Sequence, residues 1–133
     1  MNKIVVSGKR KTAVAKATIT EGSGKVTVNK KPIGFLSNLQ QLEINEPLAI
    51  TKSVLGELKF NIEVNVKGGG SAARVEASRL AISKAIVKFT GREEIRSAFL
   101  AYDRNMLIAD TRRKEARKPG DSKARARRQT SFR

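Results

Sequence analysis

The chain has 133 residues, which is enough for one domain and little more. Lysine and arginine number 28 against 12 acidic residues, so the formal net charge is +16. Without cysteine or histidine, the chain cannot form a disulfide framework, a zinc finger or a His metal site. No apolar run approaches the roughly 20 residues of a membrane helix, and the opening apolar run is too short for a signal peptide. We expect a soluble, intracellular protein that binds polyanions, nucleic acid before an acidic membrane surface.

The first third of the chain predicts short strands. Residues 4–7 form an apolar run typical of a strand, and residues 13–21 alternate between small apolar and polar side chains. A Gly-Ser-Gly turn at 22–24 separates them from residues 25–29, which alternate again through Val26 and Val28. This pattern predicts a hairpin between segments 13–21 and 25–29.

A helix, a strand and two further helices follow. Asn45 as N-cap and Pro47 in the first turn predict a helix that begins there and stops at Gly56. Residues 60–67 alternate perfectly and predict the clearest strand of the chain. Three glycines then precede helical spacing over residues 71–90, which Gly91 ends, and residues 93–102 predict another helix. The order of elements indicates a mixed α/β body over residues 1–111.

Residues 112–133 have a different composition. They carry ten basic and two acidic residues, and Phe132 is their one large apolar side chain. Such a segment buries too little surface to offset its conformational entropy, so we expect an extended basic tail. Because arginine pairs with phosphate through a planar fork of donors, the tail favours contacts along folded RNA. The alternative is a solvated tail without function.

Two clusters in the body also point to phosphate. Gly8 and the cations Lys9, Arg10 and Lys11 suit a sugar-phosphate backbone, although lysines also protect a strand edge from pairing. The glycines at 68–70 precede a helix N-terminus, where backbone N–H groups bind anions, and Arg74 could add a cation. This loop is neither a Walker motif nor G-x-G-x-x-G. Its alternative role is a tight turn.

For an enzyme, the candidates are Asp103 and Asp110, with Tyr102 and Ser71 in support. Two isolated aspartates beside Arg104 and Arg112 are more simply explained as paired carboxylates. A kinase-like enzyme using the triple glycine would need a magnesium-holding carboxylate, and none can be assigned. A general DNA-binding protein would need a groove-reading motif, and none is recognisable.

Several motifs, taken in their order along the chain, resemble those of the family of small-subunit ribosomal protein nine. They are GKRKTA at 8–13, VKGGG at 66–70, ASRLAISKA at 77–85, DTRRKE at 110–115, KARAR at 123–127 and QTSFR at 129–133. The stretch YDRNMLIAD at 102–110 is similar to the archaeal and eukaryotic branch, and the short length favours an archaeal source. The resemblance covers nearly the whole chain and is least clear over residues 35–45.

The resemblance implies a two-layer α/β sandwich of a mixed sheet and helices, like the second domain of small-subunit ribosomal protein five. It implies a non-enzymatic, cofactor-free constituent of the small ribosomal subunit in the cytoplasm, which takes part in translation. Its partners would be head rRNA of the 3′ major domain, neighbouring head proteins and the anticodon stem-loop of P-site tRNA, with no membrane partner.

The residue patterns and the resemblance together predict a set of binding residues. The tRNA-proximal residue is Arg133, by position in the family. Where bacterial relatives end in two adjacent cations, Phe132 precedes Arg133 here, so a terminal two-cation grip on tRNA is not implied. Many relatives have glutamine where Arg74 stands. The predicted rRNA-binding residues are Lys9, Arg10, Lys11, Gly68, Gly69, Gly70, Arg74, Arg112, Arg113, Lys114, Lys118, Lys123, Arg125, Arg127 and Arg128.

Overall fold

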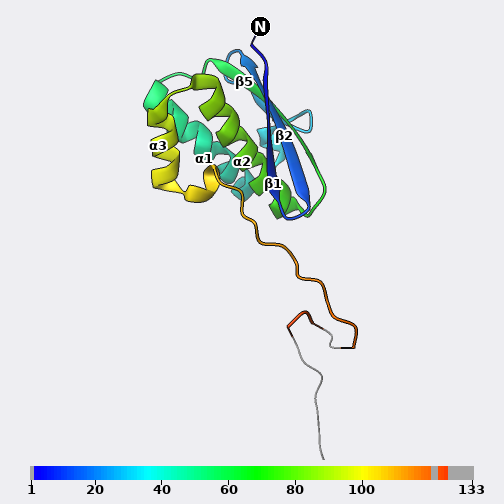
Figure 1. The fold of residues 1–133 in the computed structure, drawn as a ribbon. Coiled ribbons are helices and arrows are strands. Elements are labelled where there is room, and N and C mark those ends of the chain that lie inside the picture. Colours follow the sequence, from blue (N-terminus) through cyan, green and yellow to red (C-terminus); the bar gives the residue numbers. More distant parts are fainter. Residues whose placement is uncertain (1, 121–122, 126–133) are drawn as a thin grey trace, which may run out of the picture.

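The computed structural model describes residues 2–120 and 123–125. Helices cover one face of a five-stranded mixed sheet of strand order β1-β2-β5-β3-β4, which confirms the two-layer α/β sandwich (Figure 1). None of the described helices is both long and apolar enough to cross a membrane. The strands are β1 (Ile4–Arg10), β2 (Ala13–Glu21), β3 (Val26–Val28), β4 (Lys31–Pro32) and β5 (Phe60–Lys67); the helices are η1 (Ile33–Phe35), α1 (Asn38–Leu55), α2 (Ser71–Thr90), α3 (Glu93–Tyr102) and η2 (Arg104–Met106).

Alternation in the sequence predicted two central strands with their correct bounds. Along β5 every second residue from Phe60 to Val66 is buried, and along β2 the residues Ala13, Ala15, Ala17 and Ile19 are fully buried. The opposite residues are partly or fully exposed because no helix covers that face. The strand predicted at 4–7 extends to Arg10, since β1 pairs with β2 as far as Arg10 opposite Ala13.

The predicted hairpin between β2 and β3 is wrong. β5 lies between these two strands, antiparallel to β2 and parallel to β3. The turn at 22–24 therefore bridges over β5, where the Asn61 side chain accepts hydrogen bonds from the N–H groups of Ser23 and Lys25, both at 3.0 Å. Alternation reports which face of a strand is buried but not which strand lies beside it.

The predicted start of α1 is also wrong. The helix begins at Asn38, and its N-cap is Ser37, eight residues before the predicted N-cap Asn45; Ser37 and Gln40 form a capping box in which each side chain binds the other's backbone N–H. Pro47 consequently lies inside the helix, where it donates no hydrogen bond to the preceding turn. Burial stabilises it there, and its carbonyl accepts a 2.7 Å hydrogen bond from the Thr51 hydroxyl. The stop at Gly56 and the bounds of α2 and α3 are as predicted.

The helix α2 lies very close to the first two strands. Gly8 of β1 is buried, and a Cβ atom there would come within 2.5 Å of the Ala77 carbonyl oxygen and 2.7 Å of the Ala81 nitrogen. Ala13, Ala15 and Ala17 of β2 also present only methyl groups on this face of the sheet. These small residues let the backbone of α2 approach the sheet, and no larger side chain would fit at Gly8.

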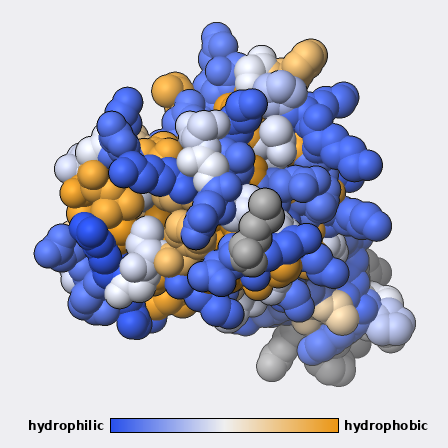
Figure 2. All heavy atoms as spheres, turned by 90° about the horizontal axis from the view of Figure 1, so that it is seen from above, coloured by the Kyte–Doolittle hydropathy of each residue, from blue (hydrophilic) through white to orange (hydrophobic). Residues whose placement is uncertain are grey.

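The surface of the body is predominantly hydrophilic. Figure 2 shows blue, hydrophilic residues over most of the visible face, and a gathering of orange, hydrophobic residues on the left. Figure 1 places α3 and α1 on that side. Among the described residues most large apolar side chains are in the core, but seven are exposed: Val5, Phe35, Leu39, Leu42, Leu100, Tyr102 and Ile108.

Gly8→Ala tests the close contact between β1 and α2. The added methyl group meets backbone atoms that cannot rotate away, so we expect the free energy of unfolding to fall by about 1–3 kcal/mol. Gly34→Ala is the matched control, because a Cβ atom at Gly34 meets no atom within 4 Å. Urea unfolding followed by circular dichroism measures both variants. Equal stability of the two would contradict this account of the packing.

Candidate nucleic-acid interface

The structure brings two of the predicted basic clusters together. The β1–β2 hairpin ends at Lys11, whose φ of 53° closes a tight turn. The loop after β5 lies against this hairpin, because a Cβ atom on Gly68 would be 2.6 Å from the Thr12 carbonyl oxygen. We call the surface formed by Lys9, Lys11, the loop 68–70 and Arg74 the basic end.

The loop at 68–70 positions the N-terminus of α2 at the basic end. Gly68 and Gly69 have φ angles of 80° and 66°, which favour glycine, so the loop is also the tight turn of the alternative interpretation. Gly70 is the N-cap and has no side-chain hydrogen bond to offer, which leaves the first N–H groups of this 20-residue helix without an intrahelical partner. They give this end a partial positive charge.

Arg74 adds a full charge beside those N–H groups. Its Nε donates a 3.0 Å hydrogen bond to the Gly68 carbonyl oxygen, which holds the side chain across the loop. Its two Nη groups have no hydrogen bond with any described residue and are free for a ligand. Arg74 also lines a groove of about 420 Å³ together with Gly69 and Ser71.

The root of the tail leaves the body close to the basic end (Figure 1). Residues 111–120 are exposed and contain no helix or strand. Arg125 pairs with Glu115 at 2.7 Å, and this guanidinium holds the pKa of the Glu115 carboxyl below its usual range. The exposed predicted cations of the described tail are Arg112, Arg113, Lys114, Lys118, Lys123 and Arg125. Arg127, Arg128 and Arg133 lie outside the described residues.

Arg10 lies in a different environment from its neighbours Lys9 and Lys11. Its side chain is only 16% exposed, with Nε 2.6 Å from the Glu76 carboxylate and Nη1 2.6 Å from that of Asp110. Arg10 thus connects β1 to α2 and to the root of the tail. The sequence context suggested that a sugar-phosphate backbone could approach Gly8. The structure shows instead that α2 covers this glycine.

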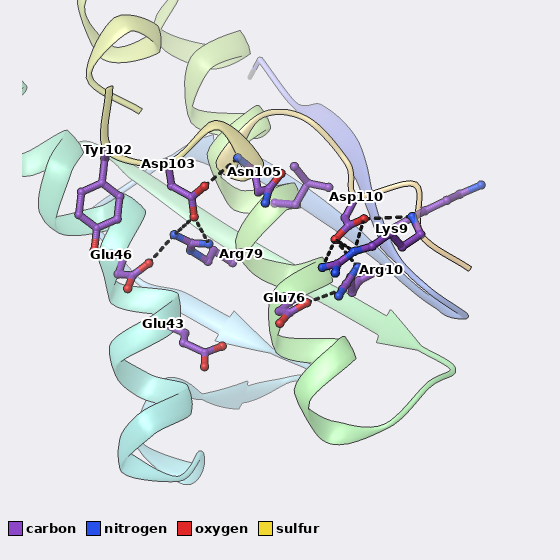
Figure 3. A pocket seen from close by; sticks show the side chains of 12 residues that line it. Lys9, Arg10, Glu43, Glu46, Glu76, Arg79, Tyr102, Asp103, Asn105 and Asp110 are labelled. Carbon is purple, nitrogen blue, oxygen red and sulfur yellow. Dashed lines mark hydrogen bonds and ion pairs between the residues drawn. The ribbon is translucent and has the colours of Figure 1, made fainter. Parts of the chain in front are cut away.

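A second arginine, which the sequence analysis did not single out, has the same arrangement. Arg79 of α2 is 15% exposed and pairs with Glu46 of α1 at 2.5 Å and with Asp103 at 3.3 Å. Both arginines line one pocket of about 520 Å³, and each lies between two carboxylates from different parts of the chain (Figure 3). The two carboxylates that pair with Arg79 are distant from it in the sequence, so no local pattern could have identified this arginine.

The two aspartates considered for catalysis are ion-paired. Asp110 pairs with Arg112 as predicted and also with Arg10, whereas Asp103 pairs with Arg79 rather than Arg104. The guanidinium and backbone N–H of Arg112 hydrogen-bond the Asp110 carboxylate and hold its pKa well below the usual range, and the charge of Arg10 adds to this effect. In the described part of the chain, no group of three or more ligands is arranged to hold a metal ion.

The open face of the sheet adds two cations that the sequence analysis missed. Lys67 and Lys9 lie in one row, on either side of Val14, and Lys16 lies in the next row. All three lysines are exposed. The alternation of β2 and β5 places Lys16 and Lys67 on the polar face, so this signal was available. The structure adds that Lys67 and Lys9 reach the same corner.

An α/β body that presents a cluster of free cations and an uncapped helix N-terminus at one end is typical of the class of nucleic-acid-binding proteins. The family model for ribosomal protein S9/S16 matches residues 8–133. The "Small ribosomal subunit protein uS9" of Methanococcus vannielii is 45% identical over 129 residues, which cover 95% of each chain. That of Methanococcus maripaludis strain C5 is 43% identical over the same share.

The chain belongs to the ribosomal protein S9/S16 family. This membership confirms the resemblance found in the sequence, including its archaeal character, since both relatives are archaeal. It identifies the protein as a structural ribosomal component rather than an enzyme, and so overturns the kinase-like alternative.

Asp110→Asn tests whether the Arg10–Asp110–Arg112 contacts stabilise the protein. A carboxyl whose pKa is lowered by folding stabilises the folded state above its unfolded pKa, and this stabilisation is lost as the pH falls through the folded pKa. The melting temperature of the variant should therefore lie below that of the parent by a constant amount from about pH 7 to about pH 5, and the difference should shrink in stronger acid.

Glu57→Gln is the control, since that side chain is 79% exposed and 3.9 Å from Lys59. Calorimetry across the pH range should find almost no effect of this substitution at neutral pH. If Asp110→Asn behaved like Glu57→Gln, the contacts at the tail root would not contribute to stability.

Proposed function

We propose that the protein, a structural constituent of the small ribosomal subunit in the cytoplasm, binds rRNA of the subunit head. In this proposal the basic end contacts the 3′ major domain, and the tail runs along rRNA toward the anticodon stem-loop of P-site tRNA. Neighbouring head proteins are further partners. Family membership supports rRNA over duplex DNA as the polyanion.

The observation that carries the proposal is the convergence of three cation-bearing segments. The hairpin, the glycine loop and the tail root are far apart in the sequence, yet the fold brings them to one end of the body (Figure 1). Lys9 and Lys11 are exposed there, beside the uncapped N-terminus of α2. Such a surface fits phosphates of a folded RNA whose backbone passes the end of the sheet.

Binding would be mainly electrostatic. Each cation that neutralises a phosphate releases a condensed counterion, so affinity falls steeply as salt rises. Arg10 belongs to the proposed set and adds positive potential to the basic end, although two carboxylates share its guanidinium. In the tail, an RNA phosphate would replace Glu115 as the partner of Arg125.

Arg127, Arg128 and Arg133 complete the proposed set on composition and family resemblance alone. Because residues 112–120 are exposed and without regular structure, ordering of the tail would be coupled to RNA binding. We propose that Arg133 is the cation nearest the tRNA. Phe132 leaves it as a single terminal charge rather than one of a pair.

The double substitution Lys11→Gln and Arg74→Gln tests the basic end. If each residue binds one phosphate, the slope of log affinity against log salt for a head-rRNA fragment should decrease by about 0.7–0.9 per residue. Lys52→Gln with Lys59→Gln is the matched control, because these lysines lie together at the other end of the sheet. Fluorescence anisotropy from about 50 to about 200 mM salt measures both slopes. Equal changes in the two proteins would disprove a localised interface.

Deletion of residues 123–133 tests the tail. The body should remain folded, since its core lies within residues 13–106, and should still sediment with small subunits. Release of P-site tRNA from these subunits should be several-fold faster because the tail cations are lost. A variant with a Gly/Ser segment of equal length separates charge from length, and it should behave like the deletion. Unchanged tRNA retention in the deleted subunits would refute the role of the tail.

A further inference from the structure

One stretch of this cationic chain contains no cation at all. Between Lys31 and Lys52 the sequence has no lysine or arginine, and its only charged residues are Glu43 and Glu46. This stretch forms η1 and most of α1. All 28 cations lie in the rest of the chain. The surface of this stretch therefore lacks the positive charge of the basic end.

The same stretch carries the three most exposed large apolar side chains of the described residues. Phe35, Leu39 and Leu42 are 75%, 67% and 64% exposed. Leu39, Leu42 and Glu46 are spaced i, i+3 and i+7, so they lie on one side of α1, away from the buried Ile44 and Leu48. Apolar residues gathered in this way on a surface mark a contact with another molecule.

Carboxylates border the apolar residues. Glu43 and Glu46 line the pocket of Figure 3 together with Tyr102, a residue that is 57% exposed. Glu46 is already paired with Arg79, but the Glu43 carboxylate has no ion pair with any described residue. We call the surface formed by Phe35, Leu39, Leu42, Glu43 and Tyr102 the apolar-acidic face.

We propose that the apolar-acidic face binds a cationic segment of a neighbouring protein, whose apolar side chains cover Phe35, Leu39 and Leu42 and whose lysine or arginine pairs with Glu43. The proposal rests on the proposed function, because the neighbour is a component of the same particle. RNA does not fit this face: Glu43 would repel phosphates, and no cation of the stretch could neutralise them.

A second copy of the chain does not fit the face either. A twofold contact places the same patch on both sides, so Glu43 would approach its own copy between two bodies of high positive charge. A cationic partner segment has the opposite requirement. Its positive charge would be balanced by Glu43 on this face and by phosphates of the adjoining rRNA. The proposed rRNA adjoins this face because Leu36 and Gln40 of the same stretch line one groove with Arg74 of the basic end.

The absence of cysteine makes a direct test possible. Leu42→Cys creates the only thiol of the chain, at an exposed position whose substitution leaves the core unchanged. We expect a maleimide to react with this thiol about tenfold more slowly in assembled small subunits than in the free protein, because a covered site reacts only when it opens. An equal rate in both would overturn the proposal.

A photoactivated cross-linker on the same thiol identifies what covers it. The expected product joins residue 42 to a protein segment with lysine or arginine beside apolar residues, identified by mass spectrometry. A cross-link to rRNA, to a second copy or to the tail of the same chain would overturn the proposal. Normal sedimentation with small subunits shows that the proposed function holds in the same sample, so failure of the docking proposal is distinguishable from failure of that function.

Charge reversal tests the role of Glu43. In the Leu42→Cys background, Glu43→Lys should lower the yield of the protein cross-link about threefold, because a favourable pair becomes a repulsive one. Glu57→Lys changes the net charge equally at a residue outside the apolar-acidic face and should leave the yield unchanged. Equal yields for the two reversals would overturn the proposed charge complementarity.

Discussion

The close contact of α2 with the sheet determines where the helix N-terminus and Arg74 lie relative to the β1–β2 hairpin. It is possible because Gly8 has no side chain where β1 meets the backbone of Ala77 and Ala81. This contact sets the height of α2 above the sheet, and with it the place of the helix N-terminus and of Arg74 and Arg79. A wider separation would move these groups away from the β1–β2 hairpin and the root of the tail.

Charge repulsion is the second constraint on the fold. A chain of +16 must bring cations near one another, and repulsion between them opposes compaction. The structure places two arginines in mostly buried positions, each between two carboxylates, so that Arg10 and Arg79 connect elements without leaving a buried cation unpaired. The remaining cations stay exposed. The protein therefore uses two arginines mainly to hold its own elements together and leaves other cations exposed for the proposed RNA contacts.

The two proposed surfaces are neighbours with different chemistry. The basic end presents free cations and helix N–H groups, whereas the apolar-acidic face presents leucines and a carboxylate. Both adjoin the groove lined by Gln40 and Arg74. In an assembled particle, a partner segment on one surface and RNA on the other would contact each other as well as this protein. Such an arrangement would make the two binding events mutually favourable.

The sequence by itself determined the elements with strong local signals. Alternation identified β2 and β5 with their correct bounds, because one face of each strand is buried, and the glycines at 68–70 and 91 marked both ends of α2. The capping box at Ser37 was also a local signal, but Pro47 suggested a later start because proline usually occupies the first turn of a helix. The predicted cations at Lys9, Lys11 and Arg74 are indeed exposed.

Only the tertiary structure decided which segments are neighbours. The insertion of β5 between β2 and β3 depends on backbone pairing over long sequence separations, which leaves no trace in the period of either strand. The same holds for the site. In the sequence, Arg10 is one of three adjacent cations. In the structure it pairs with Glu76, 66 residues away, because α2 packs on β1. Side-chain type predicts charge, whereas burial beside a distant carboxylate decides whether that charge is free for a ligand.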